Sequence, residues 1–299
     1  MNDLVRGCGV ALVTPFSEGE INYDTLGKLV DMHVELSGSI IAAGTTSEAA
    51  TMTDEEYHQV IKFVIERANK HIPVIAGAGS NCTAAAIEKS RFCEKAGADG
   101  LLIVTPYYNK TTQRGLINHY KMIAESTSLP IIVYNVPGRT GMNIEPKTVL
   151  ELSKIKNIVG IKEASGNISQ VAEIIRICPK DFLVYSGNDD MVVPLMSLGG
   201  KGVISVVANI LPAETKKIVD DFNSGNFEAA RDAQLAMNGL INSLFIETNP
   251  IPVKEAMGIL NMCSPEVREP LYPMSTENRE KLIEEMNNYG IGLAGNVSK

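Results

Sequence analysis

Short runs of apolar and β-branched residues return about every 30 residues along most of this chain, and this spacing constrains the fold more than any other feature. Stretches with helical character separate most of the runs. Eight runs are present, and they begin near Val10, Ile40, Val74, Leu101, Ile131, Ile158, Leu183 and Val203. Alternating strands and helices predict a parallel sheet, and eight such units are the number that closes a β/α barrel. We therefore expect an α/β chain built on a (β/α)8 barrel.

The intervening helices are encoded most clearly in residues 53–70. Thr53 and Glu56 have the spacing of a capping box. Apolar residues then follow at helical spacing on one face, namely Tyr57, Val60, Ile61, Val64, Ile65 and Ala68. Farther along, Gly97 is placed to end a helix just before the LLIVTP strand. The predicted order of helix and strand thus repeats.

The chain changes character after the eighth run. No strand signal follows Ala208, and residues 212–290 are interpreted as several helices separated by Gly225, by the break at residues 249–252 and by Pro270. We expect a catalytic barrel over residues 1–224 and a C-terminal helical domain over residues 225–299. Because no Pro/Ser-rich linker lies between them, the two parts should pack together.

Composition and charge exclude several classes of protein. The chain is 44% hydrophobic and 21% charged, as in an ordinary globular protein, and its net charge of -8 argues against a nucleic-acid partner. No apolar run approaches the ~18 residues of a membrane span, and the first residues lack the apolar core of a secretory signal. Five widely spaced cysteines without a C-x-x-C pair predict reduced thiols and a cytoplasmic location. The four histidines lie in separate segments, so a metal site is not expected.

Lys162 is the strongest candidate for chemistry, because it ends an apolar run and is followed at once by polar residues. In a β/α barrel the carboxyl ends of the strands carry the active site. Apolar surroundings lower the pKa of an amine from about 10.4 and leave more of it as the free nucleophile. Such a lysine can form a Schiff base with a carbonyl substrate. The alternative is a lysine whose stem packs on the barrel rim while its ammonium group reaches water.

Other strand ends carry polar residues that a barrel would bring to the same mouth. Residues 44–48, GTTSE, offer hydroxyl and amide groups suited to a carboxylate, although such a turn also caps helices. Tyr134 ends the fifth strand, and Arg139 follows it as a fork for a carboxylate or as one half of a surface ion pair. Tyr107 and Tyr108 follow the fourth strand, where adjacent tyrosines are also typical of packing or of an interface.

The remaining polar segments have simpler interpretations. In YSGNDD, after the seventh strand, we interpret Asn188 or Asp189 as the cap of the next helix, with Asp190 at its positive end. A metal site or an acid/base pair is the alternative. The glycine-rich residues 77–81 and 199–202 match neither a dinucleotide-binding nor a P-loop pattern, so we interpret them as turns.

Together, the lysine, the tyrosine, the threonine turn and the arginine predict an imine-forming aldolase site. A carbonyl compound would condense with Lys162, and a nearby phenol would transfer protons. The threonine turn and Arg139 would hold carboxylate groups at the two ends of the reactants.

Seven segments resemble the dihydrodipicolinate synthase and N-acetylneuraminate lyase superfamily in order and approximate spacing, over nearly the whole chain. They are GTTSEAAT, TPYYN, YNVPGRTG, GIKEASGN, SGNDD, GVISVVAN and ETNPIPVK. The arginine of YNVPGRTG together with TPYYN makes the dihydrodipicolinate synthases the most similar branch. The resemblance implies a lyase of lysine and diaminopimelate biosynthesis that condenses pyruvate with L-aspartate 4-semialdehyde to 4-hydroxy-tetrahydrodipicolinate. It also implies that no metal or organic cofactor is required.

The resemblance implies catalytic roles for four residues of this chain. Lys162 would form the Schiff base with pyruvate, and Tyr134 would be the general acid and base. Thr45 would link Tyr134 by hydrogen bonds to Tyr108, which in this family reaches in from a neighbouring subunit. A dimer would then be the minimal catalytic unit, paired into a homotetramer.

Four further residues are implied in substrate binding. Thr46 would bind the pyruvate carboxylate, and Gly187 and Ile204 would line the pyruvate side of the site. Arg139 would hold the carboxylate of aspartate semialdehyde.

One departure from the family pattern is Ser47, where many members have glycine. If the turn needs a positive φ there, serine would strain it. Ala49, where many members have serine, is the other.

The implied feedback pocket for lysine is only partly present. Asn81 and Tyr107 fit it, whereas Asp54, Tyr57 and Ala85 stand where lysine-inhibited relatives carry histidines and a glutamate. We therefore expect free lysine to inhibit weakly or not at all.

Three other functions remain as alternatives. The first is a sister aldolase that acts on a sugar acid such as N-acetylneuraminate or 2-keto-3-deoxygluconate, against which Arg139 argues. The second is a catalytically silent barrel that senses or binds a small molecule, against which the intact set of Lys162, Tyr134 and Thr45 argues. The third is a metal-dependent barrel aldolase, which the missing ligand spacing disfavours.

Overall fold

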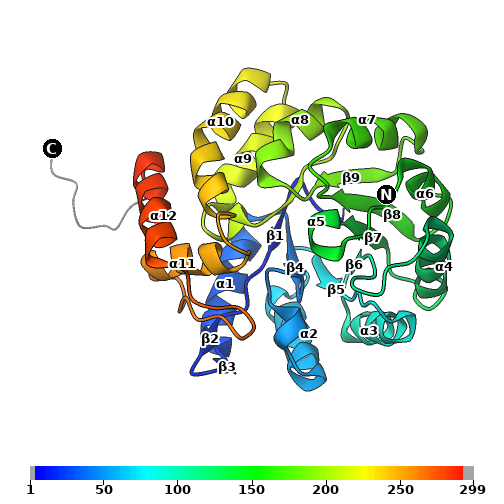
Figure 1. Ribbon diagram of the computed structural model, residues 1–299, viewed down its shortest axis with the longest axis horizontal. Helices are drawn as coiled ribbons and strands as arrows, with labels where there is room; N and C mark the ends of the chain where they lie inside the picture. Colours follow the sequence, from blue (N-terminus) through cyan, green and yellow to red (C-terminus); the bar gives the residue numbers. More distant parts are fainter. Residues whose placement is uncertain (1–3, 292–299) are drawn as a thin grey trace, which may run out of the picture.

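Eight parallel strands close into a barrel in this computed structural model, which describes residues 4–291 (Figure 1). The ring closes where the first of these strands pairs with the last. The strands are β1 (Cys8–Ala11), β4 (Ser39–Ala42), β5 (Val74–Gly77), β6 (Gly100–Val104), β7 (Ile131–Asn135), β8 (Ile158–Glu163), β9 (Leu183–Ser186) and β10 (Val203–Ser205). Each of them coincides with one of the eight predicted runs, so the barrel prediction is confirmed. The sequence did not indicate a small hairpin, β2 (Phe16–Ser17) and β3 (Glu20–Ile21), that follows β1.

Helices surround the barrel and connect its strands. They are α1 (Tyr23–Leu36), α2 (Asp54–Ala68), α3 (Thr83–Ala96), α4 (Gln113–Ala124), α5 (Pro137–Thr140), α6 (Pro146–Leu152), α7 (Ile168–Ile177), α8 (Val192–Ser197) and α9 (Pro212–Asn223). The capping box predicted for α2 is present, since Thr53 Oγ1 accepts from the amide of Glu56 and the Glu56 carboxylate accepts from the amide of Thr53. All six apolar residues of its predicted face are buried. Gly97 ends α3 in the left-handed region, also as predicted.

Side chains alternate along the strands between the barrel interior and the layer beneath the helices. On β4, Ile41 belongs to the interior, whereas Ile40 and Ala42 pack in the outer layer. On β8, Ile161 packs in the outer layer. The next residue therefore faces inward, which directs Lys162 into the barrel. The interior cluster consists of Leu4, Val5, Ala11, Ile41, Ile75, Leu102, Ile132, Tyr134, Val136, Tyr185 and Ile204.

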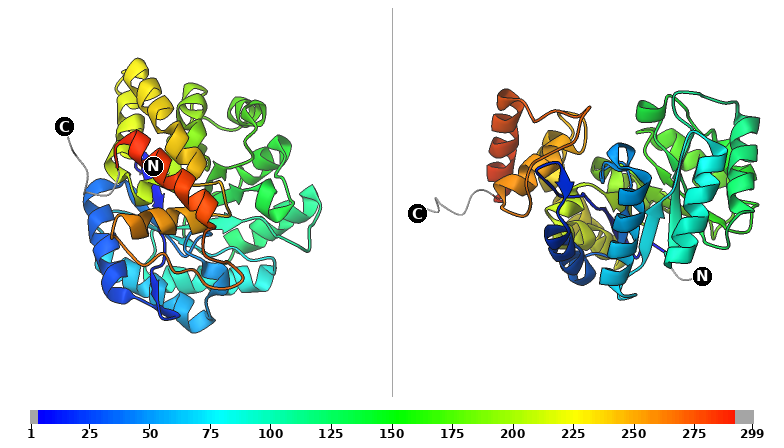
Figure 2. Two further views of the ribbon diagram at one scale, coloured as in Figure 1. Left: turned by 60° about the vertical axis from the view of Figure 1, so that its left-hand side comes forward. Right: turned by 90° about the horizontal axis from the view of Figure 1, so that it is seen from below.

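Three helices extend the structure beyond the barrel. They are α10 (Phe227–Ser243), α11 (Ile251–Ile259) and α12 (Thr276–Tyr289), and they lie together at one side of the molecule (Figures 1 and 2). No strand follows β10 within residues 4–291, as predicted. The domain boundary after residue 224 falls between α9 and α10 and stays a prediction. Over the same residues, no helix is long and apolar enough to cross a bilayer.

Candidate active site

Lys162 and Tyr134 are paired neighbours inside the barrel. Tyr134 on β7 stands opposite Lys162 on β8, and the lysine Nζ lies 4.4 Å from the centroid of the tyrosine ring. The side chain of Lys162 is in the barrel interior with only 5% of the residue exposed. The prediction of a buried lysine near the end of its strand is confirmed. The alternative of a rim lysine that reaches water is wrong, because the strand alternation turns this residue inward.

Burial favours the uncharged form of both side chains and shifts their pKa values in opposite directions. It lowers the pKa of Lys162 to about 8, an effect that Asp189 opposes and Arg139 reinforces. It also raises the pKa of Tyr134 to about 12, against the opposing effects of Arg139 and of a hydrogen bond with Thr45. The site therefore pairs an amine that loses its proton readily with a phenol that stays protonated and can donate.

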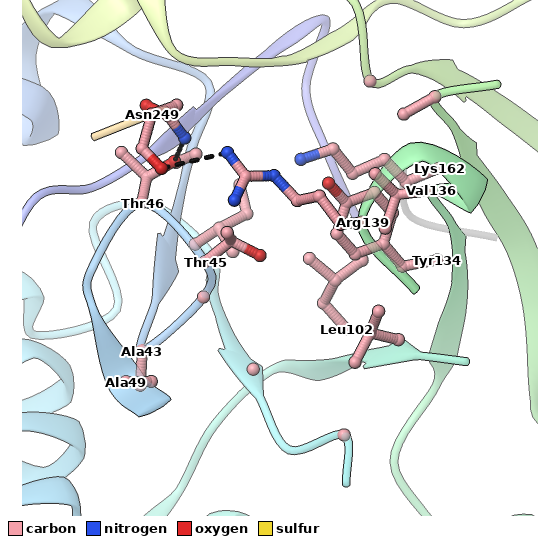
Figure 3. A pocket seen from close by; sticks show the side chains of 18 of the residues that line it. Ala43, Thr45, Thr46, Ala49, Leu102, Tyr134, Val136, Arg139, Lys162 and Asn249 are labelled. Carbon is pink, nitrogen blue, oxygen red and sulfur yellow. Dashed lines mark hydrogen bonds between the residues drawn. The ribbon is translucent and has the colours of Figure 1, made fainter. Parts of the chain in front are cut away.

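The threonine turn, residues 44–48, lies across the cavity from these two side chains (Figure 3). Thr46 is buried, and its Oγ1 accepts a hydrogen bond of 3.0 Å from Asn249 Nδ2. Ser47 Oγ donates to the carbonyl of Leu12 at 2.5 Å and accepts from the amide of Gly44 at 3.2 Å. Within the threonine turn the residue with a positive φ is Glu48, and just before the turn it is Ala43, so Ser47 is not strained by a positive φ.

Arg139 enters the cavity from the short helix α5 (Figure 3). Its Nη2 donates to the carbonyl oxygen of Asn249 at 2.9 Å, and among residues 4–291 it forms no ion pair with a carboxylate. The surface-ion-pair alternative is therefore not found in the described chain. The residue is exposed rather than enclosed, so its remaining N–H groups are accessible to an acidic ligand.

The two residues expected to line the pyruvate side differ in position. Gly187 is part of the cavity wall, and a Cβ at this position would lie 2.6 Å from Ala164 Cβ and 3.0 Å from Lys162 Cε. Only glycine leaves room there for the lysine side chain. Ile204, in contrast, is fully buried in the interior cluster and is not among the residues that line the cavity.

The cavity has a volume of about 510 Å³ and reaches from the barrel interior to the loops. It is lined by Thr45, Thr46, Tyr134, Arg139, Lys162, Gly187, Asn188, Phe245 and Asn249, and extends to Tyr57, Gly79, Lys89 and Tyr107. Asn81 is not among the lining residues, but its side-chain amide donates to the carbonyl of Tyr107 at 3.2 Å. Over residues 4–291, no group of three or more His, Cys, Asp or Glu side chains is arranged to hold a metal ion.

Tyr108 differs from the other predicted site residues, because it is absent from the cavity wall. It is 94% exposed and has a φ of 67° in the loop after β6, whereas Tyr107 is only 39% exposed and lines the cavity. Within this single chain the relay from Thr45 to Tyr108 is therefore not assembled.

Asp189 has a different role from the predicted helix cap. It is buried, and its Oδ2 accepts from the amides of Val206 and Val207 at 2.9 and 3.1 Å. Asn188 makes no capping hydrogen bond either. The capping interpretation is wrong because amides that follow the neighbouring strand β10 bind the carboxylate. Burial raises the pKa of Asp189, although hydrogen bonds from Ser205 and from the two amides and the charge of Lys162 oppose the change.

Asn249 was not singled out from the sequence, although it belongs to the quoted segment ETNPIPVK. It contacts both proposed carboxylate-binding groups, through its side-chain amide to Thr46 and its carbonyl to Arg139 (Figure 3). No local pattern marks it, since its partners lie more than a hundred residues away along the chain.

The comparisons with known proteins agree with this geometry. A family model described as the dihydrodipicolinate synthetase family matches residues 4–288. The chain belongs to this family. The 4-hydroxy-tetrahydrodipicolinate synthase of Acetivibrio thermocellus is 57% identical over 289 residues, which are 96% of this chain and 98% of the relative.

Solved structures in the dihydrodipicolinate synthetase family share the whole fold. The dihydrodipicolinate synthase of Aquifex aeolicus superposes with a TM-score of 0.94 at 45% identity, covering 97% of this chain and 99% of the other. A structure described as the first monomeric dihydrodipicolinate synthase variant has a TM-score of 0.94 at 41% identity, with 96% and 98% covered. The family membership inferred from the seven sequence segments is thus confirmed.

Proposed function

We propose that this chain condenses pyruvate with L-aspartate 4-semialdehyde to give 4-hydroxy-tetrahydrodipicolinate, the lyase reaction of lysine and diaminopimelate biosynthesis. The observation that carries the proposal is the buried Lys162 beside Tyr134, at the base of a cavity whose rim carries Arg139. Relatives at 57% and 54% identity over nearly the whole chain are 4-hydroxy-tetrahydrodipicolinate synthases, which supports this reaction over cleavage of a sugar acid.

The chemistry follows from the two interior side chains. The free amine of Lys162 attacks the keto carbon of pyruvate, and loss of water gives an imine. Tyr134, which becomes a phenolate when it protonates the leaving water, accepts a methyl proton and converts the imine to an enamine, whose carbon attacks the aldehyde of the second substrate. Tyr134 donates the proton that the aldehyde oxygen acquires, and Thr45 orients the phenol through the hydrogen bond between them. The amine of aspartate semialdehyde then displaces Lys162 and closes the ring.

Two groups at the mouth bind the carboxylates. The turn that carries Thr46 holds that of pyruvate, with Gly187 leaving space beside Lys162. The exposed fork of Arg139 holds that of aspartate semialdehyde, because a guanidinium group binds a carboxylate through two parallel hydrogen bonds. This charge selects an acidic aldehyde over a neutral sugar.

We also propose that the enzyme works as a homotetramer built from two dimers. The 94% exposure of Tyr108 supports this arrangement, since the residue is accessible to a partner's site. The five free cysteines support a cytoplasmic location.

The proposal can be tested with pyruvate and borohydride. The wild-type protein should gain the mass of one reduced pyruvate adduct per chain on the peptide that contains Lys162, and Lys162→Ala should gain none. Aspartate semialdehyde should then be consumed together with pyruvate, whereas a panel of sugar acids should not be cleaved. Labelling of another peptide contradicts the imine mechanism. Pyruvate binding without turnover identifies the chain as a sensor, and cleavage of a sugar acid identifies a sister aldolase.

A further inference from the structure

A buried ion pair joins the threonine turn to helix α11. Lys254 Nζ donates to Glu48 Oε1 at 2.6 Å, and the two side chains are 0% and 1% exposed. The lysine also donates to the carbonyl of Glu266 at 2.6 Å and lies 4.1 Å from the centroid of the Phe16 ring. The second carboxylate oxygen of Glu48 accepts from the amide of Arg268 at 2.9 Å. Both charges are therefore removed from water and bound on more than one side.

Such a buried ion pair contributes little net stability to a protein. The cost of removing two charges from water often exceeds their attraction, and apolar residues of similar volume often stabilise a protein as well or better. A fully hydrogen-bonded buried pair does, however, restrict the relative placement of the segments that carry it. The Glu48–Lys254 pair therefore restricts the placement of α11 against the threonine turn.

Glu48 belongs to the threonine turn, and Lys254 lies close in sequence to Asn249, which contacts both carboxylate-binding groups. Glu48 closes the threonine turn, since its amide donates to the carbonyl of Thr45 at 3.1 Å and its φ is 56°. Lys254 lies in the first turn of α11, where its amide donates to the carbonyl of Pro250 at 3.0 Å. The residue before Pro250 is Asn249.

A second bond joins the same two segments closer to the cavity. Asn249 Nδ2 donates to Thr46 Oγ1 at 3.0 Å, and the Asn249 carbonyl accepts from Arg139 Nη2 at 2.9 Å (Figure 3). A continuous path of hydrogen bonds and two short backbone segments thus connects the ion pair to Arg139.

We propose that Glu48 and Lys254 are positioning residues that set the distance between the two carboxylate-binding groups of the site. By fixing α11 against the threonine turn, the pair places Asn249, and Asn249 in turn places Thr46 and Arg139. The ligands assigned to these two groups rest on the function proposed above. The positioning itself rests on contacts that do not depend on it.

The alternative is that the pair only attaches the C-terminal segment to the barrel. Another contact already does so, because the Arg268 guanidinium donates to both oxygens of Glu56 at 2.6 and 3.0 Å. A purely structural pair predicts that stability and substrate affinity change together. A positioning pair predicts that affinity falls even where stability is retained.

The test uses the double variant Glu48→Gln/Lys254→Met. The glutamine side chain would keep an acceptor for the Arg268 amide, and the two changes remove both buried charges at nearly constant volume. We expect a folded protein whose melting temperature is close to that of the wild type. The pyruvate concentration that gives half-maximal borohydride trapping should rise about tenfold, and the KM for aspartate semialdehyde should rise similarly, because both groups are misplaced.

The matched control is Arg279→Met. Arg279 Nε binds Glu255 Oε1 at 2.6 Å, so this pair involves the residue next to Lys254 on α11 but none of the cavity wall. Its half-saturating pyruvate concentration should equal that of the wild type. Lys254→Arg is the second variant, because it retains the charge but changes its geometry. It should also weaken the binding of both substrates.

The outcomes separate this inference from the proposed function. If wild-type protein is not trapped by pyruvate, the proposed function fails whatever the variants do. If wild-type protein is trapped and either folded variant, the double one or Lys254→Arg, keeps wild-type half-saturation for both substrates, the positioning role is overturned. If the double variant does not fold, Lys254→Arg alone decides. A raised half-saturating pyruvate concentration and a raised KM for aspartate semialdehyde then support the positioning role, and unchanged values contradict it.

Discussion

Lys162 is the residue at which catalysis and stability oppose each other. A nucleophilic amine must lose its proton near neutral pH, and burial in the barrel achieves this by making the charged form unfavourable. The same burial destabilises the folded protein whenever the lysine is protonated. Tyr134 does not show this conflict, because burial keeps its phenol in the neutral form that donates a proton.

We expect Lys162→Met to abolish imine formation and to raise the free energy of unfolding. The folded-state pKa of Lys162 is about 8 and its ordinary value is 10.5, so the unfolded chain binds the proton more tightly. The gain in the free energy of unfolding over the wild type should be at most about 3 kcal/mol below pH 8. It should disappear as the pH rises from 8 to 10.5. Urea unfolding of both proteins across this pH range measures the difference, and a pH-independent difference contradicts the shifted pKa.

Arg139→Ala should raise the KM for aspartate semialdehyde about tenfold or more, and the KM for pyruvate much less. The reason is that the lost guanidinium group is the one that binds the carboxylate of aspartate semialdehyde. Steady-state kinetics with each substrate varied in turn provide the measurement. Arg139→Lys is the control: it retains the charge without the two-pronged geometry and should give an intermediate value. Equal effects of Arg139→Ala on both substrates would assign the residue to support of Asn249, to which it also donates.

Between secondary-structure elements, the segment that follows α11 is held against α2 by charge. Arg268 binds Glu56 through two nitrogens, and its guanidinium lies 4.4 Å from the centroid of the Phe16 ring. Glu56 also completes the capping box of α2. The hydrogen bond from Arg268 is the largest effect that lowers the pKa of Glu56, which is about 2.

Glu56→Gln should destabilise the protein by about 1 kcal/mol at pH 7, since the pair is partly solvated and screened. Glutamine retains the capping acceptor, so the change tests the charge alone. A carboxyl with a lowered folded-state pKa stabilises the protein above its ordinary value near 4.5, and this contribution is lost as the pH falls toward 2. The difference in the free energy of unfolding between wild type and Glu56→Gln should therefore be clearly smaller at pH 3 than at pH 7. A difference of the same size at both pH values would mean that packing, rather than charge, holds the segment.

At the scale of the whole molecule, the cavity of one chain contains every proposed catalytic residue except Tyr108. We expect mixed assemblies of inactive Tyr108→Phe and inactive Lys162→Ala chains to recover part of the activity, since one site of each hybrid would combine an intact lysine with a partner's intact tyrosine. Native mass spectrometry identifies the hybrids, and turnover is measured on the same sample. Hybrids without activity would contradict the donation of Tyr108 by a partner chain.

The extension of the cavity toward Tyr57 predicts the response to lysine. The Tyr57 hydroxyl is already bound to the carbonyl of Gly77 at 2.8 Å, and Lys89 Nζ lies 4.8 Å from the centroid of the Tyr57 ring. A cation already present there repels a second ammonium group, and Ala85 offers no carboxylate. Initial rates at subsaturating pyruvate should stay nearly constant across a lysine titration. Strong inhibition below about 1 mM would require acceptors for the ammonium group elsewhere in the assembly.

The sequence by itself determined the barrel, the capping box of α2 and the lysine at the end of its strand, because each depends on residues close together in the chain. A run of apolar residues predicts a buried strand, and a parallel barrel places its carboxyl end at the site. Only the tertiary structure decided the partners of Asp189, the bridging position of Asn249 and the burial of Glu48 with Lys254. Those contacts join residues 17 to 206 positions apart, and no local pattern specifies which distant amide or charge will satisfy a buried polar group.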